Sequence, residues 1–314
     1  PRFNTSAAVI FITEEQVKKN ILKDLGWPSL AQEASGLAAC GQFTGKEHQM
    51  FPLSADNQLV LLVGLGSEAD LTLTGLRTAV RKALVSGFVK RMRSVEILSL
   101  QKQQDDQSVI AVIEGIVIGA YAWKKYKTPD QDVEPADRRY TIVAPDKKIY
   151  RDAVVTAQNV NFARDLVNEN ADVVNAVFFE KTVKAVCRGE KKISFEILGR
   201  KEMEAKGLNL HLAVNQGSRN EPRLIIVRYQ GRAGAGYDAA LIGKGITFDT
   251  GGINLKPSGS VETMRTDMSG AAGVAGVLKN ALALKIKKNL LFVFALAENA
   301  VGSGAYKPGD VVKS

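Results

Sequence analysis

Short apolar runs alternate with helix-like stretches along most of the chain, and this alternation most limits its possible folds. In the first half, apolar runs typical of buried strands occupy residues 58–66, 95–100 and 140–144, while amphipathic patterns predict helices at 73–89 and 109–123. The N-terminal run at 7–12 is also strand-like. Strands that alternate with helices predict an α/β fold in which helices cover the faces of a sheet.

The same alternation continues in the second half. Strands are predicted at 195–198, 224–229, 239–244 and 289–297, and a helix rich in glycine and alanine at 269–284. Its small residues would let it approach a sheet closely, so the last two strands and this helix predict a βαβ unit. A long helix is predicted at 148–167. We therefore expect a smaller N-terminal α/β domain (1–150) and a C-terminal α/β domain (151–314) with a mostly parallel or mixed sheet.

Cysteine and histidine usage argues against a disulfide scaffold or a histidine-based metal site. The chain has two cysteines, Cys40 and Cys187, which favours a reducing, cytoplasmic compartment and two small buried side chains. The two histidines, His48 and His211, match no metal-ligand spacing and are interpreted as structural. No window reaches the ~18 consecutive apolar residues of a membrane span, so no membrane partner is expected.

Two further features have simple interpretations. The net charge of +9 would permit nucleic-acid binding, but the basic residues are scattered and only 7% of residues are aromatic, which favours solvated faces. The glycines of the Gly64, Leu65, Gly66 turn follow a strand and precede a helix. A dinucleotide-binding turn would need a third glycine that is absent, so a tight strand-to-helix turn is favoured.

The glycine-rich segment 243–267 carries the most informative charges. Lys244 is predicted at a strand end, and Asp249 and Asp267 flank an irregular loop, with Asp267 just before a helix whose amides would favour a carboxylate. Two carboxylates brought together repel unless a cation or a proton lies between them. A lysine or a metal ion could supply that charge, and a lysine ligand would have to be neutral. A solvated or salt-bridged loop and a phosphate-cradling loop are the alternatives, although carboxylates would repel phosphate.

This segment, followed by Gly270, Ala271 and Ala272, resembles the metal-binding segment of the leucyl aminopeptidase (cytosol aminopeptidase, M17) family. Further blocks are similar to that family's pattern: residues 162–169, 216–218, 222–225, 297–299 and 307–310. The likeness is close over about residues 155–314 and looser before them. It implies an N-terminal macro-like α/β domain and a C-terminal metallopeptidase domain.

The resemblance also implies a dinuclear metalloaminopeptidase that releases leucine-type residues from the N-terminus of peptides. It makes Lys244, Asp249 and Asp267 metal ligands. Lys256 would bind the substrate carbonyl and stabilise the oxyanion, and Met264 would line the pocket for the N-terminal side chain. The implied cofactors are two Mn²⁺ or Zn²⁺ ions with a bicarbonate-like anion, and the implied assembly is a homo-hexamer. Glu262 and Arg265, in the same loop, receive no catalytic role.

The match to the family pattern is incomplete. The family pattern continues with an Asn-Thr-Asp-Ala-Glu-Gly-Arg block that holds two more ligands and an arginine, and residues 1–314 do not contain it. Ala300 and Val301 also replace the usual Met-Pro, which we interpret as a packing variation. We expect a longer natural protein, with little or no turnover by residues 1–314 alone. The alternatives are a catalytically dead relative, a nucleic-acid-binding protein on this scaffold, since some family members bind DNA, and a non-catalytic scaffold subunit.

Overall fold

The computed structural model describes residues 7–99, 105–128, 138–142 and 147–314. The chain divides into two compact units, Pro1–Gln158 and Asn159–Ser314. The boundary falls inside the long helix α5 (Lys147–Asn168), which matches the helix predicted at 148–167. The last residues of the strands predicted at 95–100 and 140–144 lie outside the described ranges.

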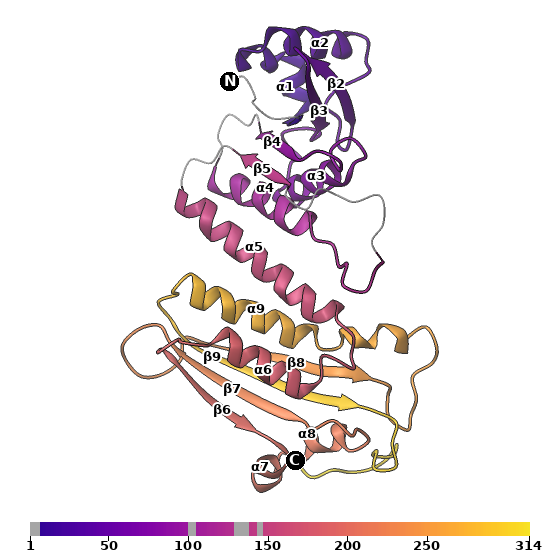
Figure 1. The fold of residues 1–314 in the computed structure, drawn as a ribbon, viewed down its shortest axis with the longest axis vertical. Helices are drawn as coiled ribbons and strands as arrows, with labels where there is room; N and C mark the ends of the chain where they lie inside the picture. Colours follow the sequence, from indigo (N-terminus) through magenta and orange to yellow (C-terminus); the bar gives the residue numbers. More distant parts are fainter. Residues whose placement is uncertain (1–6, 100–104, 129–137, 143–146) are drawn as a thin grey trace. The chain divides into compact units, whose positions relative to one another are not determined.

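The first unit is built on a five-stranded sheet with the order β2-β3-β1-β4-β5. Strand β2 pairs antiparallel with β3, and the other neighbours are parallel (Figure 1). Its strands are β1 (Ala7–Ile12), β2 (Met50–Ala55), β3 (Gln58–Gly64), β4 (Ser94–Ser99) and β5 (Arg139–Ile142). Its helices before α5 are α1 (Glu14–Lys18), η1 (Ile21–Leu25), α2 (Pro28–Ala39), α3 (Leu73–Val85) and α4 (Asp106–Gly119).

Helices cover both faces of this sheet. Alternate residues of β1 point to opposite faces, and all six are buried. Ala8 and Ile10 pack in the cluster that holds Leu30 of α2, whereas Val9 and Phe11 pack in the cluster that holds residues of α3 and α4. The sequence prediction of an α/β sheet with helices on its faces is therefore confirmed for this unit.

The connection after β3 is longer than the predicted tight turn, since residues 65–72 lie between β3 and α3. The Gly64 amide donates to the Gln49 carbonyl at 2.8 Å, and the Gly66 amide donates to the Gly45 carbonyl at 2.9 Å. A Cβ on Gly64 would lie 2.1 Å from the Lys46 carbonyl oxygen. These glycines are explained by a close approach of two backbone segments.

The second unit contains a four-stranded mixed sheet with the order β6-β7-β9-β8. Strands β8 and β9 are parallel and joined through α9, so the predicted βαβ unit is confirmed, while the other neighbours are antiparallel (Figure 1). The strands are β6 (Ile193–Leu198), β7 (Arg223–Gln230), β8 (Ala239–Asp249) and β9 (Asn289–Asn299). The helices after α5 are α6 (Ala176–Val186), α7 (Arg200–Ala205), α8 (Asn209–Asn215), η2 (Val261–Thr266) and α9 (Ser269–Ala283).

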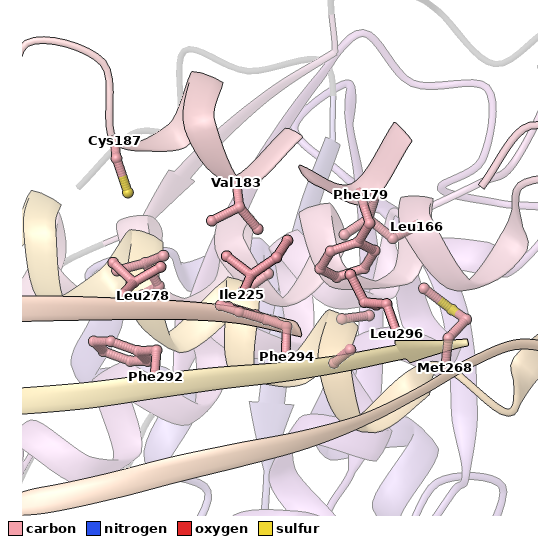
Figure 2. Packing of buried hydrophobic residues seen from close by; sticks show 14 of the residues in the cluster. Leu166, Phe179, Val183, Cys187, Ile225, Met268, Leu278, Phe292, Phe294 and Leu296 are labelled. Atoms are coloured by element: carbon pink, nitrogen blue, oxygen red, sulfur yellow. The ribbon is translucent and has the colours of Figure 1, made fainter. Parts of the chain in front are cut away.

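The core of the second unit lies on the sheet face covered by α6, α9 and the end of α5. Figure 2 shows side chains of α6 directed toward those of β9, and the rings of Phe179 and Phe294 lie 5.7 Å apart between centroids. Cys187 belongs to this core, where burial, with a smaller contribution from Glu190, raises the pKa of its thiol to about 12. The prediction of a buried small side chain is correct for Cys187.

That prediction is wrong for Cys40, which is exposed. Cys40 caps the carboxyl end of α2, where its thiol donates to the Leu37 carbonyl. His211 has a structural contact, since its Nε2 lies 2.9 Å from the Leu296 carbonyl oxygen. His48 is exposed and its Nε2 lies 3.5 Å from the carboxylate of the adjacent Glu47, so a structural role for His48 stays a prediction. Across the described ranges, no helix combines the length and the apolar character needed to cross a bilayer.

Candidate metal and catalytic site

The four charged candidate residues of segment 243–267 form two ion pairs along β8 and the loop after it, Lys244 with Asp267 and Lys256 with Asp249. Strand β8 is longer than predicted and ends at Asp249, so Lys244 lies within the strand instead of at its end. In the pairing with β9, Lys244 lies opposite Ala295 and Asp249 lies opposite Asn299. Ligand sites of open α/β sheets commonly lie beyond the carboxyl ends of parallel strands, which is the position of Asp249 and Asn299.

Asp249 is held by three donors and is only 16% exposed. Its Oδ1 accepts hydrogen bonds from the Gly251 amide and from Asn299 Nδ2, both at 2.8 Å. Its Oδ2 lies 3.4 Å from Lys256 Nζ. One carboxylate oxygen is therefore fixed by neutral donors, and the other faces a cation.

The loop after β8 folds back so that Lys256 reaches Asp249. The amide and the hydroxyl of Thr250 both donate to the Asn299 carbonyl, at 2.8 and 2.9 Å, and the Lys256 amide donates to the Thr250 carbonyl at 2.9 Å. Gly251 has a φ of +88°, and a Cβ there would lie 2.4 Å from the Asn254 carbonyl oxygen. This turn requires glycine both for its backbone conformation and for its close approach.

Close packing of α9 on β8 brings Asp267 to Lys244. A Cβ on Gly243 would lie 2.6 Å from Ala271 Cα, and a Cβ on Gly270 would lie 3.0 Å from the Lys244 amide nitrogen. Asp267 follows η2 and precedes α9, and its Oδ1 lies 2.7 Å from Lys244 Nζ. The glycine- and alanine-rich start of α9 thus allows this approach.

The second oxygen of Asp267 is unusual. Asp267 Oδ2 is buried and has no hydrogen-bond partner. No amide of α9 donates to this carboxylate within the part of the chain that the structure describes, so the expected hydrogen bonding by the helix start is absent. Leaving a buried carboxylate oxygen without a partner typically costs about 1–3 kcal/mol or more, and a cation bound there would remove that cost.

The ion pairs of Lys244 with Asp267 and of Lys256 with Asp249 agree with the alternative of a salt-bridged loop. The orphaned Asp267 oxygen is what favours a further cation. Two carboxylates are suitable donors for Mg²⁺, Mn²⁺ or Zn²⁺, and a neutral lysine amine would add a nitrogen donor. Nowhere in the described ranges do three His, Cys, Asp or Glu side chains gather in a metal-binding group. The residues therefore fit part of a metal site.

The remaining predicted residues lie on or beside η2. Met264 is half-buried, and its carbonyl accepts the Asp267 amide at 3.2 Å. Glu262 and Arg265 are exposed. Asn299, which holds Asp249, had no role in the sequence analysis. A polar residue at the end of the neighbouring parallel strand was the signal that could have identified it.

Comparison with known proteins places both units in one family. The family model described as "Cytosol aminopeptidase family, catalytic domain" matches residues 161–314, and the model for the N-terminal domain of that family matches residues 9–130. The probable cytosol aminopeptidase of Geotalea uraniireducens is 34% identical over 289 residues, which is 87% of this chain and 57% of that protein. The cytosol aminopeptidase of Encephalitozoon cuniculi is 34% identical over 262 residues, covering 82% and 52%. The chain thus spans little more than half the length of these relatives.

Solved structures support the same fold. A mutant of tomato leucine aminopeptidase has a TM-score of 0.84 at 22% identity, with 100% of this chain and 64% of that chain covered. The bottromycin maturation enzyme BotP in complex with Mn has a TM-score of 0.79 at 24% identity, with 98% and 63% covered. These likenesses confirm the two-domain α/β architecture.

Proposed function

The chain belongs to the cytosol aminopeptidase family, and from this premise we propose that it forms part of a metal-dependent aminopeptidase that removes leucine-type residues from the N-terminus of peptides. The observation that carries the proposal is the buried, unpartnered Oδ2 of Asp267 beside Lys244. This oxygen lies in the segment whose residue pattern resembles the family's metal-binding segment. A divalent cation gives it the partner that the protein does not supply.

In this proposal Lys244, Asp249 and Asp267 are metal ligands. Asp249 Oδ1 already accepts two N–H donors, so Oδ2 is the oxygen available for a metal ion. Lys244 loses its proton before it binds, since only a neutral amine has a lone pair. Two divalent ions, Mn²⁺ or Zn²⁺, would polarise the scissile carbonyl and activate water when bound. The Mn named for the BotP structure is consistent with this class of metal.

Lys256 has a different role in the proposal. Its side chain is 32% exposed, and the backbone turn that starts at Thr250 places it near Asp249. An ammonium fixed in this position stabilises the negative charge that develops on the substrate carbonyl oxygen during attack by water. Met264 would line the pocket for the substrate's N-terminal side chain, consistent with its half-buried position on the turn before Asp267.

Metal titration and kinetics together test these roles in the full-length form. We expect Asp267→Asn to weaken Mn²⁺ or Zn²⁺ binding about tenfold or more in calorimetry, because a charged ligand is lost. Lys256→Gln should bind metal normally but lose about 100-fold or more in kcat on a leucyl substrate. The control is Glu262→Gln, an exposed charge in the same loop that should change neither quantity. Unchanged metal affinity in Asp267→Asn, or no aminopeptidase activity with any of these metals, would refute the proposal.

The resemblance to the family also concerns the assembly, the compartment and a bound anion. We propose a cytoplasmic homo-hexamer with a bicarbonate-like anion near the ions, and native mass measurement tests the assembly and the scaffold-subunit alternative. Residues 1–314 alone should show little or no turnover, because two of the ligands and the arginine of the family pattern are not among them. Robust activity of this polypeptide would refute the ligand assignment. Nucleic-acid binding is tested by titration at two salt concentrations.

A further inference from the structure

A group of basic side chains lies at the end of the second unit's sheet opposite to Asp249. Three connections meet there: α6 to β6, β7 to β8, and α9 to β9 (Figure 1). This end carries eight cationic residues, Arg188, Lys191, Lys192, Arg228, Arg232, Lys285, Lys287 and Lys288, and three acidic ones, Glu190, Glu196 and Asp238. Strand β8 separates it from Asp249 by about 30 Å, at ~3.3 Å per residue.

Hydrogen bonds tie the three connections together. The Gln230 amide donates to the Lys192 carbonyl at 2.9 Å, and the Gly231 amide donates to the Lys288 carbonyl at 3.1 Å. The Tyr229 hydroxyl donates to the Ile286 carbonyl at 2.9 Å. The backbones of the lysine-bearing turns are therefore fixed next to each other.

Asn289 shapes the glycine-rich connection between β7 and β8. This buried side chain donates to the carbonyls of Gly234 and Gly236 at 3.0 and 3.2 Å, and it accepts the Arg232 amide at 3.1 Å. Gly234 and Gly236 have φ values of +96° and +81°. The Gly234 and Gly236 carbonyls thus accept hydrogen bonds from Asn289. The backbone amides of residues 234–237 donate to no acceptor within the described ranges.

The glycine-rich connection and Asn289 border a hollow of about 380 Å³. Lys191, Lys192 and Arg228 line it together with the glycine loop and Tyr237, whose ring is half exposed. Arg228 is paired with Glu196 at 2.5 Å, and Arg232 is paired with Asp238 at 2.9 Å. Lys191 and Lys192 are exposed and form no ion pair with any described residue. The nearest unpaired acid in sequence is Glu190, which is also exposed.

We propose that this hollow binds the phosphoryl group of a small phosphorylated ligand. Free amides of a glycine loop and two lysine ammonium groups are the donors that phosphate takes, and glycine allows the anion to approach the backbone. A volume of this size suits a small molecule of about nucleotide size. A polymer would need a longer basic groove with several exposed stacking side chains, whereas the lining of this hollow holds two tyrosines, of which Tyr229 is buried and Tyr237 is exposed.

Calorimetric titration with inorganic phosphate and with adenosine monophosphate tests the proposal, in low-salt buffer with a chelator to exclude binding through metal ions. We expect saturable binding of both, with the nucleotide tighter because Tyr237 contributes its ring. The double variant Lys191→Gln/Lys192→Gln should weaken both affinities about tenfold, because two charge-assisted hydrogen bonds are lost.

The matched control is Lys181→Gln/Lys201→Gln, which removes the same charge from exposed positions of the same unit outside the hollow. Lys256→Gln is a second control, because Lys256 belongs to the candidate catalytic site. Both should bind phosphate like the unmodified protein. The proposal would be overturned if neither ligand showed saturable binding, if the Lys181/Lys201 control weakened binding equally, or if Lys256→Gln lost binding. It would also be overturned if a short single-stranded oligonucleotide bound more tightly than the mononucleotide.

Discussion

Replacement of Gly243 by alanine tests whether close packing of α9 on β8 builds the candidate site. The added Cβ would lie 2.6 Å from Ala271 Cα and 2.8 Å from the Gly270 carbonyl oxygen, whereas normal contacts lie near 3.5–4.0 Å. Both neighbours are backbone atoms, so the start of α9 must move by about 1 Å. Overpacking of this kind costs about 1–3 kcal/mol, which for a unit of this size lowers the melting temperature by roughly 3–10 °C.

The control is Gly273→Ala in the same helix, where a Cβ meets nothing within 4 Å. Alanine is the better helix former, so this variant should gain about 0.5–1 kcal/mol. Differential scanning calorimetry should be combined with hydrogen exchange of β8 and α9, because both tryptophans, Trp27 and Trp123, lie in the first unit. Gly243→Ala should also weaken metal binding, since the start of α9 positions Asp267. Equal stability of Gly243→Ala and the unmodified protein would refute this account of the packing.

Three further predictions follow from the described contacts. In the native protein, iodoacetamide at pH 8 should label Cys40 and spare Cys187, whose thiol pKa burial raises to about 12, and native labelling of Cys187 would contradict this. Burial raises the pKa of the Glu180 carboxyl, but hydrogen bonds from Lys184 and Arg223 outweigh it and leave the pKa below its usual 4.5. Glu180→Gln should therefore cost about 1–3 kcal/mol at pH 7, and this loss should shrink as pH falls through the native pKa, as followed by urea unfolding with circular dichroism. A pH-independent loss would argue against it. Ile242 is 72% exposed on β8, an edge strand of the described sheet, and an exposed apolar edge strand promotes pairing between copies of a chain. Ile242→Lys should therefore reduce the light scattering that such association of residues 1–314 causes, and unchanged scattering would count against an edge-to-edge contact.

Local sequence patterns predicted many of the strands and helices, because continuous apolar runs indicate buried strands and one-sided apolar patterns indicate helices. They did not predict β2, α2 or α6. Helix ends were less accurate. The helix predicted at 109–123 runs from Asp106 to Gly119, and Asp105 caps its start with a side chain that accepts a hydrogen bond from the Ser108 amide at 2.6 Å. Such a cap depends on one local hydrogen bond that periodicity does not contain.

The candidate site was predictable only in part. Segment 243–267 stood out through its glycines and charges, but the pairing of Lys244 with Asp267 depends on how closely α9 approaches β8. The role of Asn299 depends on which strand lies beside β8, and the buried state of Asp267 Oδ2 depends on the whole turn around it. These contacts depend on tertiary packing, so local sequence patterns do not predict them.

Anomalous diffraction from Mn²⁺-soaked crystals tests the central claim most directly, because it locates the metal without reference to activity. The account predicts a manganese peak in contact with Asp267 Oδ2, with Asp249 and Lys244 as further ligands and Lys256 outside the coordination sphere. Asp267 Oδ2 still without a cation at saturating Mn²⁺, or a peak ligated by other residues, would contradict it.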